Sequence, residues 1–380
     1  MVENKKPRRS FREVPRGLAR VNHIIAIGSG KGGVGKSTVS TNFAMALKKT
    51  GYKVGLMDAD IYGPSQPEML GVGKQQPQVK GDYLLPLEKH GLVFMSLGLL
   101  LDDSQPVIWR GPMASKMIQQ FLGNVLWGDL DYLIIDLPPG SGDVQITLTQ
   151  QAPLSGVIIV TTPQHVALGV AQKGLQMFRH VNVPILGIIE NMSGFTCPKC
   201  GEKTDIFKQG GGRKLAEDLD INFLGGIPLD PELMASGDNG TPLLLNTADS
   251  PAAKEFINIA SKFIDIMAKG IEANEPEKIE ITDDGNLSFT WPDGHIAEFT
   301  PSDLRANCGC ALCVSEDTGQ KTLDIKSIPL DIKIGAFERI GRYAVSIAFS
   351  DGHNTGIYRF DKMHQMEIKQ KDASDKAFNV

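Results

Sequence analysis

The chain has 380 residues, enough for two to three domains with buried cores. Its composition, 41% hydrophobic and 22% charged, is close to the globular average and excludes a wholly disordered or fibrous protein. The longest nearly uncharged apolar stretch, Gly91 to Leu101, is shorter than the roughly 20 residues that a membrane-spanning helix requires, and no signal-peptide core follows the N-terminus. We therefore expect a cytosolic protein without a membrane partner.

The net charge of -5 is distributed unevenly along the chain. Residues 1–20 contain seven Lys or Arg and two Asp or Glu, which leaves 32 basic and 42 acidic residues in the remainder. Because nucleic-acid binding needs a concentrated basic surface, the acidic body argues against a nucleic-acid partner. Residues 1–20 are interpreted as a basic flexible arm. A targeting or docking peptide is the alternative, but Pro7, Pro15 and the two acidic residues do not suit an amphipathic presequence.

Short runs rich in β-branched residues alternate with helical segments over residues 21–270. Strands are expected at 23–29, 52–58, 91–97, 131–139, 156–162 and 184–192, and helices at 36–51, 113–125, 167–180 and 252–269. Apolar runs such as 132–135 do not alternate in polarity, which is typical of parallel strands covered by helices on both faces. This part of the chain is predicted to be an α/β domain with a doubly wound, mostly parallel sheet.

The pattern changes after residue 270. Residues 271–277 are acidic and contain a proline, which indicates a linker. Short alternating stretches with turn signals follow, so residues 278–365 are predicted to form a small β-rich (α+β) domain. Residues 366–380 are expected to be a tail.

The segment after the first expected strand matches the phosphate-binding pattern G-x-x-x-x-G-K-S/T in its strand–loop–helix context. Glycines allow successive backbone N–H groups to point at phosphate oxygens, and the helix that starts at Lys36 directs its positive end to the same charge. We expect ATP to bind here, with Lys36 on the β- and γ-phosphates and Ser37 on Mg²⁺. The expected nucleotide-binding residues are Gly30, Lys31, Gly32, Gly33, Val34, Gly35, Lys36, Ser37 and Thr38.

Two strand ends carry aspartates that suit such a site. Asp136 ends an apolar strand before a Pro-Pro-Gly loop and is expected to lie near the metal. Asp58 and Asp60 end the strand at 52–58, where a carboxylate can position the attacking water. Aspartates that only cap loops are the alternative, and it is strongest for Asp58.

Five cysteines fall into two tight clusters, a distribution that favours metal ligation over a disulfide framework. The first cluster is Cys197 and Cys200 in C-P-x-C-G. By itself this pair is also compatible with half of a zinc ribbon. A 4Fe-4S cluster takes four thiolates, so two chains of a symmetric dimer would supply a full set.

Together these motifs resemble the Mrp/ApbC family of ATP-dependent iron–sulfur cluster carriers over residues 20–270. The resemblance rests on GSGKGGVGKST, DADIYGPS, WRGPM, DLPPGSGD, TPQ, ENMSGFTCPKCG, GGG and IPLDP. Because it has a second lysine, Lys31, five residues before Lys36, the loop also resembles the deviant P-loop of the MinD/ParA/nitrogenase-iron-protein class. The resemblance implies a slow Mg-dependent ATP hydrolase that forms an ATP-sandwich homodimer, with Lys31 reaching the partner's nucleotide. It also implies a labile 4Fe-4S cluster bridged by Cys197 and Cys200 of both protomers.

The same resemblance implies roles for other residues. Asp60 would orient the water, Asp58 would join the magnesium shell, and Asn191 with Pro228 and Asp230 would lie beside adenine. The implied partners are an iron–sulfur scaffold as donor and apo-proteins as acceptors. The alternatives are a MinD/ParA-type positioning ATPase and an ATP-driven iron–sulfur reductase.

The sequence departs from the family pattern at two positions. Ser141 stands where the family usually has Thr, which is a mild change. His165 stands where it usually has an acidic residue. We predict no role for His165 beyond that of a core or surface histidine.

The second cysteine cluster, Cys308, Cys310 and Cys313, places three thiols within six residues, which favours metal chelation over unligated thiols. The segment resembles the small N-terminal domain of γ-butyrobetaine hydroxylases. This resemblance implies a Zn²⁺ site completed by a histidine from a later strand. His353, beside the second of two Asp-Gly turns, is the expected ligand, and His295, beside the first, is the weaker choice. We expect a zinc-stabilised recognition module without oxygenase chemistry.

Overall fold

The computed structural model of the chain describes residues 15–61, 63–73, 75–100, 111–140, 145, 148–149, 152, 154–181, 183–197, 199–246, 249–292, 294–310, 312–314, 321–340, 344–360 and 363–364. These residues fall into two compact units, Pro15–Ile266 and a second unit that starts at Met267. The first 14 residues of the predicted basic arm, Ser141 and the predicted tail lie outside the described residues.

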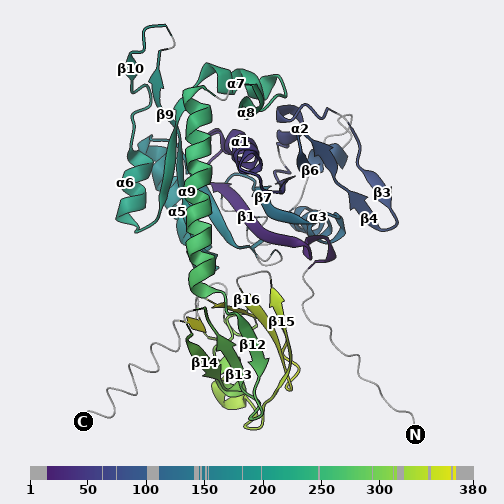
Figure 1. The fold of residues 1–380 in the computed structure, drawn as a ribbon. Coiled ribbons are helices and arrows are strands. Elements are labelled where there is room, and N and C mark those ends of the chain that lie inside the picture. Colours follow the sequence, from purple (N-terminus) through teal and green to yellow (C-terminus); the bar gives the residue numbers. More distant parts are fainter. Residues whose placement is uncertain are drawn as a thin grey trace, which may run out of the picture. The chain divides into compact units, whose positions relative to one another are not determined.

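A nine-stranded sheet forms the centre of the first unit, in the order β10-β9-β8-β1-β7-β2-β6-β5, with β11 beside β9 (Figure 1). The β5–β6 and β9–β10 pairs are antiparallel and the other pairs are parallel. The prediction of a mostly parallel α/β fold is therefore confirmed. The strands are β1 (Val21–Ser29), β2 (Val54–Asp58), β5 (Leu87–Lys89), β6 (Leu92–Ser96), β7 (Leu130–Asp136), β8 (Gly156–Thr161), β9 (Ile185–Thr196), β10 (Lys203–Thr204) and β11 (Phe223–Leu229).

The non-alternating apolar strands lie at the centre of this sheet. Ile25 and Ile27 of β1 and Leu133, Ile134 and Ile135 of β7 are all fully buried. A strand whose consecutive side chains are all buried must be covered on both faces, because successive side chains point to opposite sides of a sheet. β3 (Gln78–Lys80) and β4 (Tyr83–Leu85) form a separate hairpin.

Helices lie on both faces of the sheet (Figure 1). None of the described helices is both long and apolar enough to cross a membrane. The helices are η1 (Arg16–Leu18), α1 (Lys36–Lys49), α2 (Gln66–Met69), η2 (Leu97–Leu100), α3 (Gly111–Asn124), α5 (His165–His180), α6 (Gly211–Asp218), α7 (Pro231–Asp238), α8 (Leu243–Asn246) and α9 (Pro251–Asn274).

The last of these helices is longer than the sequence predicts. We expect it to end at Lys269, whereas α9 continues to Asn274 and includes residues 271–274 of the predicted linker. The physical reason is that Ile-Glu-Ala-Asn contains no helix breaker. The first residue that cannot continue the helix is Pro276, and the residue before a proline already disfavours helical geometry.

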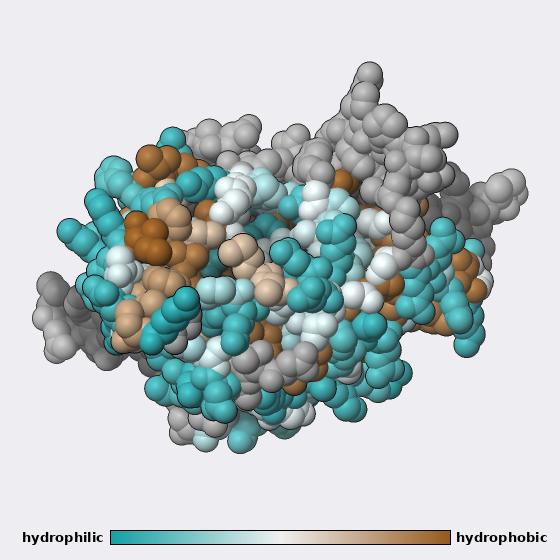
Figure 2. Space-filling view, turned by 90° about the horizontal axis from the view of Figure 1, so that it is seen from above, coloured by the Kyte–Doolittle hydropathy of each residue, from teal (hydrophilic) through white to brown (hydrophobic). Residues whose placement is uncertain are grey.

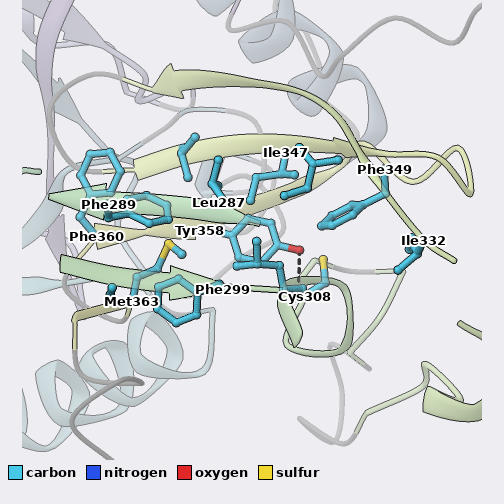
Figure 3. Close-up of a cluster of buried hydrophobic side chains, with 14 of the residues drawn as sticks. Leu287, Phe289, Phe299, Cys308, Ile332, Ile347, Phe349, Tyr358, Phe360 and Met363 are labelled. Atoms are coloured by element: carbon cyan, nitrogen blue, oxygen red, sulfur yellow. Dashed lines mark hydrogen bonds between the residues drawn. The ribbon is translucent and has the colours of Figure 1, made fainter. Parts of the chain in front are cut away.

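The second unit contains two three-stranded antiparallel sheets, β12-β13-β14 and β15-β16-β17. Buried side chains from both sheets form its core, which also contains Cys308 and Cys313 (Figure 3). The elements are β12 (Lys278–Ile281), β13 (Leu287–Thr290), β14 (Ile296–Phe299), α10 (Pro301–Ala306), η3 (Ile325–Ser327), β15 (Ile334–Ile340), β16 (Ala344–Phe349) and β17 (Gly356–Arg359).

Two hairpins of this unit have the same turn. The Trp291 N–H donates to the carbonyl of His295, and the Phe349 N–H donates to that of His353, both at 2.8 Å. A glycine with positive φ precedes each histidine, as expected for Asp-Gly turns. The two histidines therefore occupy equivalent positions in two similar hairpins.

Candidate functional site

The phosphate-binding loop connects the end of β1 to the start of α1. Gly33 and Gly35 both have a φ of 79°, in the left-handed region that favours glycine. Gly35 also lies against Asn191, because a Cβ atom there would lie 2.2 Å from Nδ2 of that side chain. The loop therefore has the glycine-dependent backbone of an anion-binding turn, and α1 begins directly after it.

Lys36 and Asp136 form a buried ion pair behind this loop. Nζ of Lys36 lies 2.5 Å from Oδ1 of Asp136 and 3.9 Å from Oδ2 of Asp60. The strand register brings these groups together, because Asp136 at the end of β7 pairs with Ile27 of β1 and with Asp58 of β2. The three aspartates proposed from the sequence thus meet at one edge of the sheet.

Three side chains that the motifs do not single out complete the bonding of these carboxylates. The Gln66 side chain donates to Asp136 at 2.9 Å, and its backbone N–H donates to Asp58 at 3.3 Å. Ser40 donates to Asp136 at 2.8 Å, and Ser96 donates to Asp58 at 2.9 Å. In the sequence, only their positions along the chain mark these three residues. Ser40 lies one turn into α1, Gln66 begins α2, and Ser96 ends the strand beside β2.

Asp58 is completely buried and lies beside a second carboxylate. Burial and the charge of Asp136 raise the pKa of Asp58 to about 7, although the Ser96 hydroxyl and the Asp60 N–H donate to it. A buried carboxylate is disfavoured in its charged form because it loses hydration. The nucleotide-free site is therefore expected to change its protonation state near neutral pH.

This shift predicts how stability depends on pH. A group whose pKa is raised by folding contributes stability that is fully present below its unfolded pKa and is lost as the pH rises through the folded pKa. Wild-type protein should lose stability between about pH 4 and pH 7 by at most about 1.4 kcal/mol per pH unit from this group. Asp58→Asn should lack that loss.

Thermal melting of the nucleotide-free protein between pH 5 and pH 8 tests this prediction. The melting temperature of Asp58→Asn minus that of wild type should rise up to about pH 7 and then level off. Any packing effect of the substitution adds an offset that does not vary with pH. A difference that stays constant over the whole range would show that Asp58 is already ionised at pH 5.

An open cavity of about 200 Å³ lies in front of the loop and is lined by three of its glycines and by Lys31, Lys36, Asp60 and Pro139. Asp60 is buried and also accepts the Gly63 N–H at 3.3 Å. Within the part of the chain that the structure describes, the ammonium of Lys31 makes no ion pair. Cations and a carboxylate thus line the same cavity as the anion-binding loop.

The residues that the family resemblance assigns to adenine lie on two adjacent strands and at the start of α7. Asn191 in β9 donates from Nδ2 to the carbonyl of Val34 in the phosphate-binding loop at 2.9 Å. Pro228 lies in β11, which pairs with β9, and Asp230 caps α7 by accepting the Glu232 N–H at 2.9 Å. Oδ2 of Asp230 is buried and has no hydrogen-bond partner among the described residues. An unpaired buried acceptor suits an exocyclic amine of a ligand.

The first cysteine pair lies at the tip of the β9–β10 hairpin (Figure 1). The Cys197 N–H donates to the Glu202 carbonyl and the Gly201 N–H donates to the Cys197 carbonyl, both at 2.9 Å. The N–H groups of Cys200 and then Lys199 donate to the Cys197 sulfur and lower the pKa of its thiol. Cys197 is half-buried and Cys200 is exposed. An accessible pair with a stabilised thiolate is suited to bind a metal centre.

Hydrophobic residues gather on the surface near this hairpin. Figure 2 views the molecule from above, and a hydrophobic patch lies on its left, the side on which Figure 1 places α5, α6 and β10. Val166 at the start of α5 is 70% exposed, and Ile206 just after β10 is 53% exposed. Exposed apolar side chains that gather on one face are typical of a contact surface.

Cys308, Cys310, Cys313 and His353 form a compact cluster in the second unit, with their ligand atoms within 4.8 Å of one another. Nε2 of His353 lies 3.2, 3.6 and 3.8 Å from the three sulfurs. A tetrahedral zinc ion with bonds of about 2.3 Å to sulfur and about 2.0 Å to nitrogen separates these atoms by about 3.5 Å. The donor set and its spacing therefore fit zinc.

Charged and polar neighbours surround this cluster. Arg305 donates to the Cys313 sulfur at 3.3 Å and to Asp351 at 2.8 Å, and Asp351 also accepts the His353 N–H at 2.9 Å. Thr355 donates to the Cys310 sulfur at 3.2 Å. Such partners orient the ligands of a metal site.

The thiols of this cluster are not equivalent. The hydrogen bond from Cys308 and that from Thr355 outweigh burial and lower the pKa of Cys310 to about 4. The hydrogen bond to Cys310, together with burial, raises the pKa of Cys308, and burial raises that of Cys313. A cation is therefore needed before all three can be thiolates.

Neither His295 nor His165 belongs to the cysteine cluster. His295 packs against the rings of Trp291 and His364, and only His353 joins the three cysteines. His165 is exposed at the start of α5, which is consistent with a surface histidine.

The parallel sheet, the glycine-rich loop and the acidic strand ends define a P-loop nucleotide-binding protein with an accessible thiol pair. Residues 20–264 match the family described as the NUBPL iron-transfer P-loop NTPases, and the chain belongs to this family. Residues 279–364 match the family of domains similar to the γ-butyrobetaine hydroxylase N-terminal domain. Both resemblances found in the sequence are thereby confirmed.

Curated relatives are named iron–sulfur cluster carrier proteins. The protein of Aquifex aeolicus is 50% identical over 63% of this chain and 66% of its own length. That of Pseudomonas fragi is 46% identical over 67% of this chain and 89% of its own length. The chain thus spans about two thirds of the Aquifex protein and most of the Pseudomonas protein.

Solved structures show the same fold. A nucleotide-binding protein of Archaeoglobus fulgidus in complex with ADP is 39% identical, with a TM-score of 0.56, over 64% of this chain and 95% of that one. The cell division ATPase MinD of Pyrococcus furiosus is 22% identical, with a TM-score of 0.50, over 64% and 99% of the two chains. The second likeness concerns the fold alone.

Proposed function

We propose that the protein is an ATP-dependent carrier that receives a labile 4Fe-4S cluster from a scaffold protein and passes it to apo-proteins. One observation carries the proposal. A single strand, β9, contacts the phosphate-binding loop through Asn191 and leads to the thiol pair six residues later. The nucleotide site and the metal-binding thiol pair thus share one strand. This arrangement suits a carrier whose affinity for the cluster depends on the bound nucleotide. The names of the relatives support this function.

The roles of the nucleotide-site residues follow from their positions. Lys36 would leave Asp136 to hold the β- and γ-phosphates, while Ser37, Asp136 and Asp58 would hold Mg²⁺ directly or through water. Mg²⁺ would neutralise phosphate charge when bound. Asp60, on the wall of the cavity, would orient the attacking water, and slow hydrolysis of ATP would result.

The cargo site is proposed to be completed by a second copy of the chain. Four thiolates hold a 4Fe-4S cluster, and each chain supplies Cys197 and Cys200. The exposed apolar side chains near the hairpin suit a contact between the two copies. Lys31, which lines the cavity without an ion pair among the described residues, would reach the nucleotide of the partner copy.

Reconstitution with iron and sulfide under anaerobic conditions tests the shared site. Wild type should hold about four irons per dimer at this site, and Cys197→Ala or Cys200→Ala alone should lose essentially all of them, because only two of four ligands remain. Iron content, visible absorption and size-exclusion chromatography report the result. Transfer to an apo-acceptor then tests the carrier function. A monomer that retains four irons would contradict the shared geometry.

Two alternatives use the same fold. A MinD/ParA-type positioning ATPase would not need the thiol pair, and a reductase would keep its cluster and cycle electrons. The accessible hairpin tip favours cargo transfer over a permanent redox centre, because a cluster that must leave needs an exposed site. A transfer assay separates the carrier from the reductase. A carrier should give its reconstituted cluster to an apo-acceptor, whereas a reductase should keep the cluster and pass on only electrons.

The second unit is proposed to be a zinc-stabilised recognition module. Its cysteines and His353 fit Zn²⁺, and the cluster joins the segment after α10 to the β16–β17 hairpin. Two of the ligands, Cys308 and Cys313, belong to the core of the unit, so zinc would act in folding. Selection of acceptor proteins is the role that we propose for the rest of its surface, and a cytosolic location remains our prediction.

A further inference from the structure

Glu190 is a fully buried carboxylate that neither the nucleotide site nor the cysteine pair uses directly. It lies in the middle of β9, at the last residue that pairs with β8, and six residues later β9 ends at the hairpin tip that carries Cys197 and Cys200. Asp and Glu are almost never fully buried unless their oxygens are paired. The bonding of Glu190 therefore indicates what the residue holds in place.

Its hydrogen-bond partners lie on both sides of the chain segment that carries Cys197 and Cys200. On the outgoing side, the Ser193 hydroxyl donates to Oε1 at 2.6 Å. On the returning side, the Gly210 N–H donates to Oε1 at 2.8 Å and the Gly212 N–H donates to Oε2. The carboxylate thus connects the start and the end of residues 191–210.

The surrounding glycines allow this close approach. A Cβ atom on Gly212 would lie 3.1 Å from the Glu190 side chain, and one on Gly211 would lie 2.9 Å from the carbonyl oxygen of Pro163. Gly210 has a φ of 83°. The three consecutive glycines let the start of α6 close over the carboxylate, and the positive end of that helix favours the buried charge.

The neighbouring residue fixes the other side of this junction. Asn191 directly follows Glu190 and contacts the phosphate-binding loop at Val34. Only five residues lie between this contact and Cys197, and the Glu190 bonds hold the base of that segment. Movement of the hairpin relative to the nucleotide site is therefore opposed by one buried group.

We propose that Glu190 is a positioning residue that holds the cysteine hairpin, and so the cluster ligands, in a set place relative to the nucleotide site. The proposal rests on the cluster-carrier function proposed above. Glu190 touches neither nucleotide nor cluster in this scheme. It acts through Ser193, Gly210 and Gly212.

Glu190→Gln tests the proposal with almost no change in volume. An amide has one acceptor oxygen and one NH₂ donor, so either orientation places an NH₂ group against the N–H of Gly210 or Gly212. Ser193→Ala is a milder variant, because it removes one donor and leaves both glycine contacts. Glu217→Gln, an exposed carboxylate on α6, is the matched control.

The variants are compared as full-length protein, with and without reconstituted cluster. In Glu190→Gln we expect amide exchange of residues 195–209 and loss of cluster to a chelator each to become about tenfold faster, with ATP affinity within about twofold of wild type. Ser193→Ala should change both rates about threefold and Glu217→Gln neither. A residue needed only for folding would instead change ATP affinity and melting together.

Wild-type exchange and cluster-loss rates in both Glu190→Gln and Ser193→Ala would overturn the proposal. If Glu190→Gln fails to fold, Ser193→Ala still decides. If wild type itself takes up no cluster, the proposed carrier function fails, while exchange of residues 195–209 in the metal-free protein still tests the positioning role. The two failures are therefore distinguishable.

Discussion

Lys36→Ala should abolish ATP hydrolysis and weaken ATP binding by about 100-fold or more. The loss has two physical causes. The variant removes the cation that we assign to the β- and γ-phosphates, and it leaves Asp136 buried without its ion-pair partner. An unpaired buried carboxylate repels the triphosphate that the loop must accept. Isothermal titration with ATP and a steady-state phosphate-release assay measure the two effects.

Asp60→Ala separates binding from hydrolysis in the same site. Its carboxylate lies on the wall of the cavity and is 3.9 Å from Nζ of Lys36, so ATP affinity should remain within a few-fold of wild type while hydrolysis is lost. For Lys36→Ala, the control for a general loss of positive charge is Lys53→Ala, which changes an exposed lysine outside the loop. Wild-type turnover in Asp60→Ala would refute its role with water.

The sequence predicts the parts of the site that depend on local pattern. The phosphate-binding loop follows from spacing alone, and the meeting of Asp58 and Asp136 follows from their place at the ends of two apolar strands. Parallel strands end at the same edge of a sheet, so strand-end residues far apart in sequence become neighbours. The spacing of six positions from Asn191 to Cys197 is likewise local.

Contacts that depend on tertiary placement could not be predicted in the same way. Gln66 and Ser96 are ordinary polar residues in the sequence, and only the folded chain shows that they donate to Asp136 and Asp58. Glu190 looks like an ordinary charged residue of a strand in the sequence, whereas two of its three partners are glycines 20 or more residues later. Hydrogen bonds across such distances leave no periodic signal in one sequence.

The two candidate histidines of the second unit show the same limit. His295 and His353 follow equivalent Asp-Gly turns, and local pattern does not separate them. The fold does, because the β16–β17 hairpin carries His353 to the three cysteines while His295 packs against Trp291. This difference provides the pair of variants needed to test the metal site.

Cys310→Ala should reduce bound zinc from about one to less than about 0.2 equivalents per chain and unfold the second unit. Two of the other ligands, Cys308 and Cys313, are part of the hydrophobic core, so loss of the metal leaves thiols that no longer join the segment after α10 to the β16–β17 hairpin. Three ligands cannot close a tetrahedral structural site. Metal analysis and hydrogen exchange of residues 278–364 measure the two losses in the full-length protein.

The control variants make this last prediction specific. Cys197→Ala, in the other unit, should keep its zinc, and Cys310→Ala should still bind ATP because the phosphate-binding loop belongs to residues 15–266. His353→Ala should lose zinc and His295→Ala should retain it, since only His353 lies within 4 Å of all three sulfurs. A full equivalent of zinc in His353→Ala with unchanged melting would show that the fourth ligand is wrong. Zinc below about half an equivalent in wild type would refute the site, because a closed Cys₃His site binds its metal tightly.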